Sequence, residues 1–250
     1  QPAAGGAPKG KGGAVKGKGG YQPPEGPAPR TPWGKPDLNG VWQRPYVPDI
    51  ERSASNGKLE YTEWGKKQWE TYNAQEGDYT GSCLPFGHSR AMGSPDPIQI
   101  MQTPTHLAFL YEQNSWFKVL PIDGTQPKKK VPTWFGDSVG HWEGDTLVVD
   151  STNFKRWALD DYFYTDPNQF RMHSDAFHTI EKIRWKDAKT LTYDLTIDDP
   201  KIFTAPWSQE FEMVAKPEWD KDGLYEYVCE ENNRCRGIRR YHKRKRILFC

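Results

Sequence analysis

The sequence predicts a mainly β fold, in which an antiparallel meander closes into a barrel with one short helix and extended basic N- and C-terminal tails. First, about ten short segments have the composition of strands and are separated by tight turns. Second, the 250 residues include 11 Trp, 12 Tyr and 11 Phe, while only 35% are hydrophobic. Aromatic side chains must therefore supply much of the core, and they suit pleated sheets. Closing the sheet into a barrel removes its unpaired edges.

The N-terminal half is predicted to contain a linker, a first strand and the helix. A Pro-rich stretch over residues 21–37 favours an extended linker, and residues 37–42 have the pattern of a strand. A helix is expected at about residues 62–74, because Thr62 can cap its first turn. Residues 75–97 are rich in Gly, Ser and Pro and are predicted to form a loop.

The rest of the predicted body is a series of strands. Residues 143–145 and 186–189 are predicted to be turns. The body is expected to form one β-barrel domain over residues 38–233, between a Gly/Lys- and Pro-rich N-terminal arm (1–37) and a basic C-terminal tail (234–250). The further strands are expected at residues 98–102, 106–111, 116–120, 141–142, 146–150, 177–185, 190–197, 207–215 and 224–230.

The formal net charge of +1 hides an uneven distribution of charge. Residues 1–20 contain four lysines and no acid, and residues 234–250 contain eight basic residues and no acid. Taking these twelve from the total of 34 leaves 22 basic residues against 33 acidic ones in residues 21–233, a net charge of −11. The chain is therefore an acidic body with two basic ends, and blocks of like charge typically mark solvated interaction tails.

The cysteines and the first residue fit an exported protein. Cys83, Cys229, Cys235 and Cys250 are even in number, as in oxidised, secreted proteins. They allow three pairings, of which we favour a disulfide between Cys83 and the region of Cys229 and Cys235. The chain begins at Gln1 without an apolar signal stretch, which fits either an arbitrary start or a mature N-terminus after signal removal.

Two resemblances support this expectation. Gly40-Val41-Trp42, on the predicted first strand, resembles the Gly-x-Trp opening of lipocalin-type barrels. Residues 136–150, GDSVGHWEGDTLVVD, resemble the signature of a large family of exported bacterial proteins of unassigned function, and residues 196–200, 206–207 and 226–232 fit the same family. The resemblance covers about residues 33–233 and neither tail. It implies an exported, lipocalin-like barrel and supplies neither a reaction nor catalytic residues.

Acid–base chemistry has one candidate pair. His141 and Glu143 are two residues apart on one face of a strand, so they could form an acid–base pair or two metal ligands of a hydrolytic or metal-dependent enzyme. The alternative is that Gly144-Asp145 simply builds a hairpin turn. The other histidines considered, His88, His106, His173 and His178, are interpreted as structural or surface residues. No hydrolase, P-loop or dinucleotide motif is present, so no catalytic residue, metal or cofactor is predicted.

Aromatic residues concentrate around one stretch that Arg156 and Arg171 flank. This stretch could line a barrel mouth for a small apolar ligand or form a protein-docking face, and the alternative is that it fills the core. The candidate ligand-lining residues are Trp134, Trp142, Trp157, Tyr162 and Tyr164.

The basic ends indicate a partner. Nucleic acid is disfavoured because the body is acidic and no nucleic-acid-binding module is recognisable. Anionic lipid headgroups or an acidic protein face suit the tails better. The candidate docking residues are Lys9, Lys11, Lys16, Lys18, Arg236, Arg239, Arg240, Lys243, Arg244, Lys245 and Arg246.

Three functional hypotheses follow in order of preference. The first is a non-catalytic accessory subunit, periplasmic or extracellular and peripherally membrane-associated. Its basic tails would bind a membrane-embedded protein complex, for example a respiratory or photosynthetic one, or an anionic membrane surface. The second is a lipocalin-like carrier of a small apolar ligand. The third is an enzyme that uses His141 and Glu143.

Overall fold

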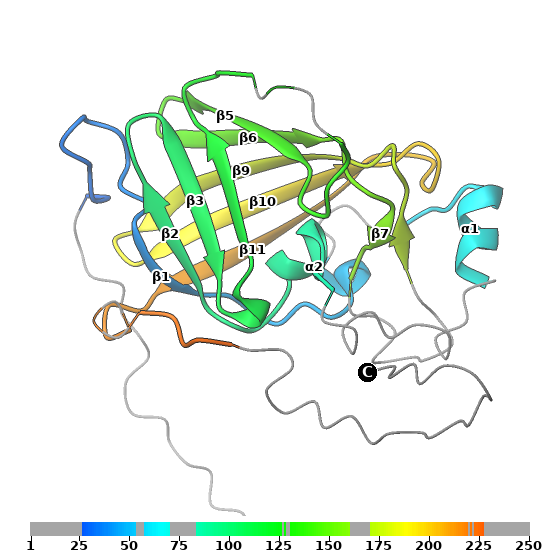
Figure 1. The fold of residues 1–250 in the computed structure, drawn as a ribbon, viewed down its shortest axis with the longest axis horizontal. Coiled ribbons are helices and arrows are strands. Elements are labelled where there is room, and N and C mark those ends of the chain that lie inside the picture. The colour runs from blue at the N-terminus through cyan, green and yellow to red at the C-terminus, as the bar shows by residue number, and fades with distance from the viewer. Residues whose placement is uncertain are drawn as a thin grey trace, which may run out of the picture.

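The computed structural model describes residues 27–53, 58–70, 84–126, 128, 131–160, 171–219, 221 and 223–227. Nine strands form one antiparallel, nearly closed, barrel-like sheet, which confirms the predicted mainly β fold (Figure 1). These strands are β1 (Gly40–Gln43), β2 (Ile98–Gln102), β3 (His106–Tyr111), β4 (Phe117–Pro121), β5 (Asp137–Glu143), β6 (Thr146–Thr152), β9 (His178–Asp187), β10 (Thr190–Asp198) and β11 (Trp207–Ala215).

The barrel is an up-and-down meander. Each strand except β4 is hydrogen-bonded to the barrel strand that follows it in sequence, and β1 also pairs with β11, so the first and last strands join. The one break in the ladder lies between β4 and β5. A separate ribbon of β7 (Trp157–Ala158) and β8 (Met172–His173) lies between β6 and β9 in sequence. Such a topology depends on local hairpins, which is why turn and strand patterns alone predict it.

The hairpin of β5 and β6 shows how local chemistry sets the register. Glu143 pairs with Thr146, so Gly144 and Asp145 form the two-residue turn between them. Gly144 has a φ of 60°, a backbone conformation that glycine adopts without strain. The predicted turn is therefore confirmed.

Two short helices accompany the barrel. α1 (Glu63–Glu70) begins where it is predicted, because the Gly65 amide donates to Thr62 Oγ1 at 3.0 Å. α2 (His88–Met92) lies in a region predicted to be a loop, so that prediction is wrong at these five residues. All five are buried, and the helix lies across one end of the barrel (Figure 1). Packing rather than helix propensity stabilises so short a helix.

Two short 3₁₀ turns, η1 (Ile50–Ser53) and η3 (Gln113–Ser115), complete the described secondary structure. The strand predicted at residues 224–230 is wrong over its described part, because residues 224–227 have no strand partner. Instead, the Tyr225 amide donates to Glu112 Oε2 at 3.0 Å, and Ser115 Oγ donates to the Tyr227 carbonyl at 3.0 Å. The chain after β11 therefore returns to the turn between β3 and β4.

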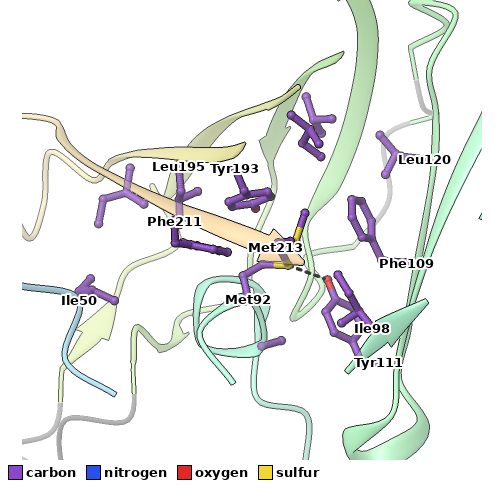
Figure 2. Close-up of a cluster of buried hydrophobic side chains, with 14 of the residues drawn as sticks. Ile50, Met92, Ile98, Phe109, Tyr111, Leu120, Tyr193, Leu195, Phe211 and Met213 are labelled. Atoms are coloured by element: carbon purple, nitrogen blue, oxygen red, sulfur yellow. Dashed lines mark hydrogen bonds between the residues drawn. The ribbon is translucent and has the colours of Figure 1, made fainter. Parts of the chain in front are cut away.

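One continuous core fills the barrel. Figure 2 shows part of it, with Met92 reaching from α2 toward Tyr111. The largest fully buried side chains include Trp42, Tyr193 and Phe109, so aromatic rings fill this core as predicted.

Candidate functional site

Several predicted residues lie outside the described part of the chain. They are the four cysteines, both sets of basic tail residues, Tyr162 and Tyr164. The disulfide and the tail contacts therefore stay predictions.

Of the predicted ligand-lining residues, the structure brings two together. Trp134 and Trp157 pack with ring centroids 6.0 Å apart beside α2, where the His88 amide donates to the Trp134 carbonyl at 3.2 Å. Trp142 does not join them, because it lies near the other end of β5 and packs against the core and below the Lys35 ammonium.

The predicted acid–base pair lies on the outside of the barrel. His141 Nε2 is 3.1 Å from Glu143 Oε1, and the two side chains are 50% and 61% exposed. Of the nearby acids, Asp137 accepts from Asn153 and Asp145 pairs with Arg30. The pair thus has the predicted common face, and both side chains lie at the surface of the barrel.

Arg171, predicted to flank a ligand, instead lies in a buried ion cluster. It is 3% exposed, and its Nη1 contacts Asp49 Oδ1 at 2.5 Å and Asp160 Oδ2 at 2.9 Å. Its Nη2 contacts Glu51 Oε2 at 3.0 Å. This cluster ties η1 to the ribbon of β7 and β8.

A second ion cluster lies inside the barrel, and sequence reasoning did not predict it. Lys118 Nζ on β4 donates to Glu181 Oε1 on β9 at 2.9 Å. His88 Nε2 on α2 lies 2.9 Å from the same oxygen, and Tyr193 on β10 donates to Glu181 Oε2 at 2.7 Å. Glu181 and His88 are 0% exposed and Lys118 is 5% exposed. We call these residues the interior cluster.

The electrostatics of the interior cluster follow from burial and pairing. Burial alone would raise the pKa of Glu181, but its electrostatic interactions and hydrogen bonds with His88, Lys118 and Tyr193 outweigh burial and hold that pKa well below its usual range. Burial lowers the pKa of His88, which therefore stays neutral at neutral pH. The cluster then holds one positive and one negative charge that neutralise each other, as buried ions require.

The interior cluster has the residue types of acid–base chemistry but is sealed from solvent. All of its charged groups are nearly or fully buried, and α2 covers that end of the barrel. The interior cluster connects the strands β4, β9 and β10 to α2 and so holds the helix in position against the barrel. A sequence signal existed: Lys118 shares a face with Leu120, and Glu181 shares one with Ile183, on strands of otherwise apolar interior faces.

The outer face of β2, β3 and β4 is uncharged and, apart from Gln99, apolar over six aligned residues. The register aligns Met101 with Ala108 and Val119, and aligns Gln99 with Leu110 and Phe117. These six residues, which carry no charge, are called the outer apolar face. Phe117, Val119 and Met101 are 64%, 57% and 53% exposed. Contiguous exposed apolar residues of this kind mark interaction sites.

The described chain ends at the rim of this face. Tyr227 is bonded to Ser115, two residues before Phe117. The basic run begins seven residues later at Arg234, so covalent geometry tethers its start within roughly 25 Å of Ser115.

Compared with family models and with curated proteins, the chain has no match. In the described ranges, no group of three or more His, Cys, Asp or Glu residues could hold a metal ion. No helix of those ranges is long and apolar enough to cross a membrane.

Proposed function

We propose that the protein is a non-catalytic accessory subunit that docks onto a membrane-embedded protein complex from the periplasmic or extracellular side. The outer apolar face provides the apolar contact, and the basic residues of the C-terminal tail provide the electrostatic one. The observation that carries this proposal is that three apolar side chains, Phe117 and Val119 on β4 and Met101 on β2, are each more than half exposed. The residues of β3 aligned between them, Ala108 and Leu110, carry no charge.

The composition of the outer apolar face supports a protein partner. Cores of protein interfaces are enriched in aromatic residues and Met and are depleted in charge, as this face is. Its side chains stand on the regular strands β2, β3 and β4, so they form a pre-organised surface rather than a protruding loop. A rigid surface of this kind loses little conformational entropy on docking.

The position of the basic run supports the same partner. The basic run starts at Arg234, which chain length keeps within roughly 25 Å of Ser115 at the rim of the outer apolar face, whereas residues 21–233 carry a net charge of −11. A suitable partner therefore presents an apolar patch next to an acidic one. The electrostatic part of such binding is weakened by salt, because the Debye length falls from about 10 Å at 0.1 M to about 3 Å at 1 M.

The test is co-migration with solubilised membranes of the source organism on native gels, using the full-length chain. The first variant is F117S/V119S, and the second replaces Arg236, Arg239 and Arg240 by Gln. The matched control is W64S, because Trp64 is a similarly exposed aromatic residue, 44% exposed, on α1, away from β2 to β4 (Figure 1). Protein-free vesicles of phosphatidylcholine and phosphatidylglycerol are tested in parallel.

We expect the wild type and W64S to co-migrate with one complex at low salt, and both docking variants to lose that complex. Undiminished co-migration of F117S/V119S would contradict the proposal. Equal binding of the wild type to protein-free vesicles would also contradict it, and would assign the face to anionic lipid instead. Self-association that F117S/V119S abolishes would assign the face to a second copy of the chain.

A further inference from the structure

The short helix α2 closes one end of the barrel and contacts the interior at both of its own ends (Figure 1). At its first residue, the fully buried ring of His88 reaches the interior cluster. At its last residue, Met92 Sδ accepts a hydrogen bond from Tyr111 Oη at 3.5 Å (Figure 2). A helix of this length is not stable by itself, so its position depends on such contacts.

The ring of His88 lies between an anion and a cation. Its Nε2 is 2.9 Å from Glu181 Oε1, and its Nδ1 is 3.5 Å from Lys118 Nζ. An ammonium group can only donate a hydrogen bond, so Nδ1 must be the unprotonated, accepting nitrogen. The proton of the neutral ring then lies on Nε2, which faces Glu181. The contact with Lys118 therefore requires a neutral His88.

Protonation of His88 reverses that contact. It places a second N–H on Nδ1, so that two donors and two positive charges face each other over the 3.5 Å between Nδ1 and Lys118 Nζ. Burial, the largest influence, and the charge of Lys118 disfavour the imidazolium more than the charge of Glu181 favours it, so the pKa of His88 is lowered. The closed barrel thus opposes a charged His88, whereas water would accept a hydrogen bond from it.

The other polar groups around His88 leave this conflict in place. Ser151 Oγ lies 3.4 Å from both Lys118 Nζ and Glu181 Oε1, and Tyr193 donates to Glu181. His173 on β8 is a second buried histidine, whose pKa the charge of His88 lowers further. Phe154 packs on both imidazole rings, with centroids 5.7 Å from His88 and 5.9 Å from His173. A proton on one histidine therefore disfavours a proton on the other.

The remaining bonds of α2 are made by groups that do not titrate near neutral pH. The His88 amide donates to the Trp134 carbonyl, and Ser89 Oγ donates to the Leu159 carbonyl at 2.6 Å. Among residues 88–92, His88 has the one side chain that titrates between pH 4 and pH 8. Gly87, with a φ of 84°, and Gly93 flank the helix, and glycine readily accommodates changes in backbone angles.

We propose that His88 is an acid-sensitive switch: uptake of one proton breaks its contact with Lys118, releases α2 from the end of the barrel and opens the interior cluster to solvent. The switch depends on the inside of the barrel and not on the outer apolar face. It can therefore be present whether or not the docking proposal holds.

The direction of the pH dependence follows from linkage. In the open state His88 is in water and has the ordinary pKa of about 6.5, whereas in the closed state its pKa is lower. Opening therefore takes up a proton below about pH 6.5, and α2 stays closed above that pH. The equilibrium constant for opening should rise about tenfold for each pH unit below 6.5, until the pKa of the closed state is reached.

The test is hydrogen exchange of the full-length protein between pH 7.5 and pH 4.5, followed by mass spectrometry and corrected for the intrinsic exchange rate. Peptides over residues 86–93 report on α2, and peptides over residues 190–198 report on β10 in the core. The variant is H88Q, which cannot take up a proton but keeps an oxygen that can accept from Lys118. The matched control is H141Q, because the His141 side chain is 50% exposed on the outside of the barrel.

We expect the corrected exchange of residues 86–93 to rise about tenfold between pH 6 and pH 5 in the wild type and in H141Q, while residues 190–198 stay protected. In H88Q the rise should be lost. His173→Phe should retain it, because this substitution leaves the contact between His88 and Lys118 intact.

Three results would overturn the switch: an equal acid response of residues 86–93 in H88Q, loss of the response in His173→Phe, or exchange of residues 190–198 that rises in step with α2. Circular dichroism must show that H88Q folds. If it does not, the ¹⁵N chemical shifts of His88 in the wild type decide the question. A neutral ring with its proton on Nε2 at pH 7.5 is expected, and an imidazolium at that pH would contradict the proposal.

Discussion

At residues 117–119, β4 has the opposite polarity to that expected of a barrel strand. Lys118 points into the barrel and is 5% exposed, whereas its neighbours Phe117 and Val119 point outward and are 64% and 57% exposed. Barrel strands of soluble proteins normally bury apolar residues and expose polar ones. Here the Lys118 ammonium is tolerated inside because Glu181 neutralises it. The side chains of Phe117 and Val119 lie outside, where they are more than half exposed and contribute little to the core.

This inversion separates two roles within one strand. The interior residues contribute to stability, and their replacement should be felt in the free energy of unfolding. Replacement of the exterior residues should change the free energy of unfolding little. Their apolar character is therefore better explained by contact with a partner than by the stability of the fold. The predictions below test this division, from the largest expected effect on stability to the smallest.

Removing the negative charge of the interior cluster should have the largest effect. Glu181→Gln leaves the Lys118 ammonium buried without an anion, and should lower the free energy of unfolding by about 3–5 kcal/mol, measured by urea denaturation. The control is the double substitution Lys118→Met with Glu181→Met, which removes both charges. It should recover most of the loss. A double variant as unstable as the single one would show that packing, not charge, explains the effect.

Acidification should destabilise the interior through its buried histidines. Burial lowers the pKa of His173 to about 4, compared with 6.5 for an exposed histidine. Between pH 6.5 and about 4, this histidine is therefore protonated in the unfolded chain and neutral in the folded protein. The free energy of unfolding is therefore unaffected by His173 above about pH 6.5. It falls as the pH drops from 6.5 toward 4, by about 3 kcal/mol for this residue.

The measurement is the free energy of unfolding between pH 8 and pH 4, for the wild type and for His173→Phe. The variant keeps an aromatic ring next to Phe177, whose ring stacks on that of His173 with centroids 4.1 Å apart. It should show a weaker pH dependence over this range. Equal slopes for the two proteins would rule out His173 as a source.

A hydrogen bond in the interior should contribute more than an equivalent one outside. Ser138 Oγ is 2.7 Å from Ser151 Oγ within the barrel, and Ser208 Oγ is 2.9 Å from Thr196 Oγ1 on β11 and β10. Ser138→Ala should lower the free energy of unfolding by about 1 kcal/mol. Ser208→Ala is the matched control and should have about half that effect or less. A reversed order would contradict the division.

The smallest effect on stability is expected at the outer apolar face. Phe117→Ala should change the free energy of unfolding by less than about 0.5 kcal/mol. Phe109→Ala provides the inside comparison, because Phe109 on β3 is 1% exposed and aligns with Lys118. It should cost about 3–5 kcal/mol. Similar losses for the two substitutions would remove the argument that Phe117 is free for a partner.

Much of the fold follows from local sequence patterns. The strands at residues 98–102 and 207–215 have the predicted bounds, because each is a short alternating run between turn residues. The turn at Gly144 and the cap at Thr62 likewise depend on neighbouring residues only.

The interior cluster and α2 could not be predicted in the same way. Lys118 and Glu181 are 63 positions apart, and only the closed meander brings them together. α2 is too short for a helical pattern and depends on burial at the barrel end. The outer apolar face could not be predicted either, because the sequence suggests that the apolar residues Phe117 and Val119 are buried. Only the structure shows that Lys118, between them, points into the barrel and that both apolar side chains therefore point outward.

Site-specific photocrosslinking tests the central claim most directly, that the outer apolar face is a docking surface. A benzophenone side chain is placed at position 117 or, as the control, at position 64, and the labelled protein is added to solubilised membranes of the source organism. The docking account predicts a crosslink from position 117 to one membrane protein, lost at high salt, and none from position 64. Crosslinks from position 64 alone, or from neither position under conditions in which the unlabelled protein co-migrates with the complex, would contradict it.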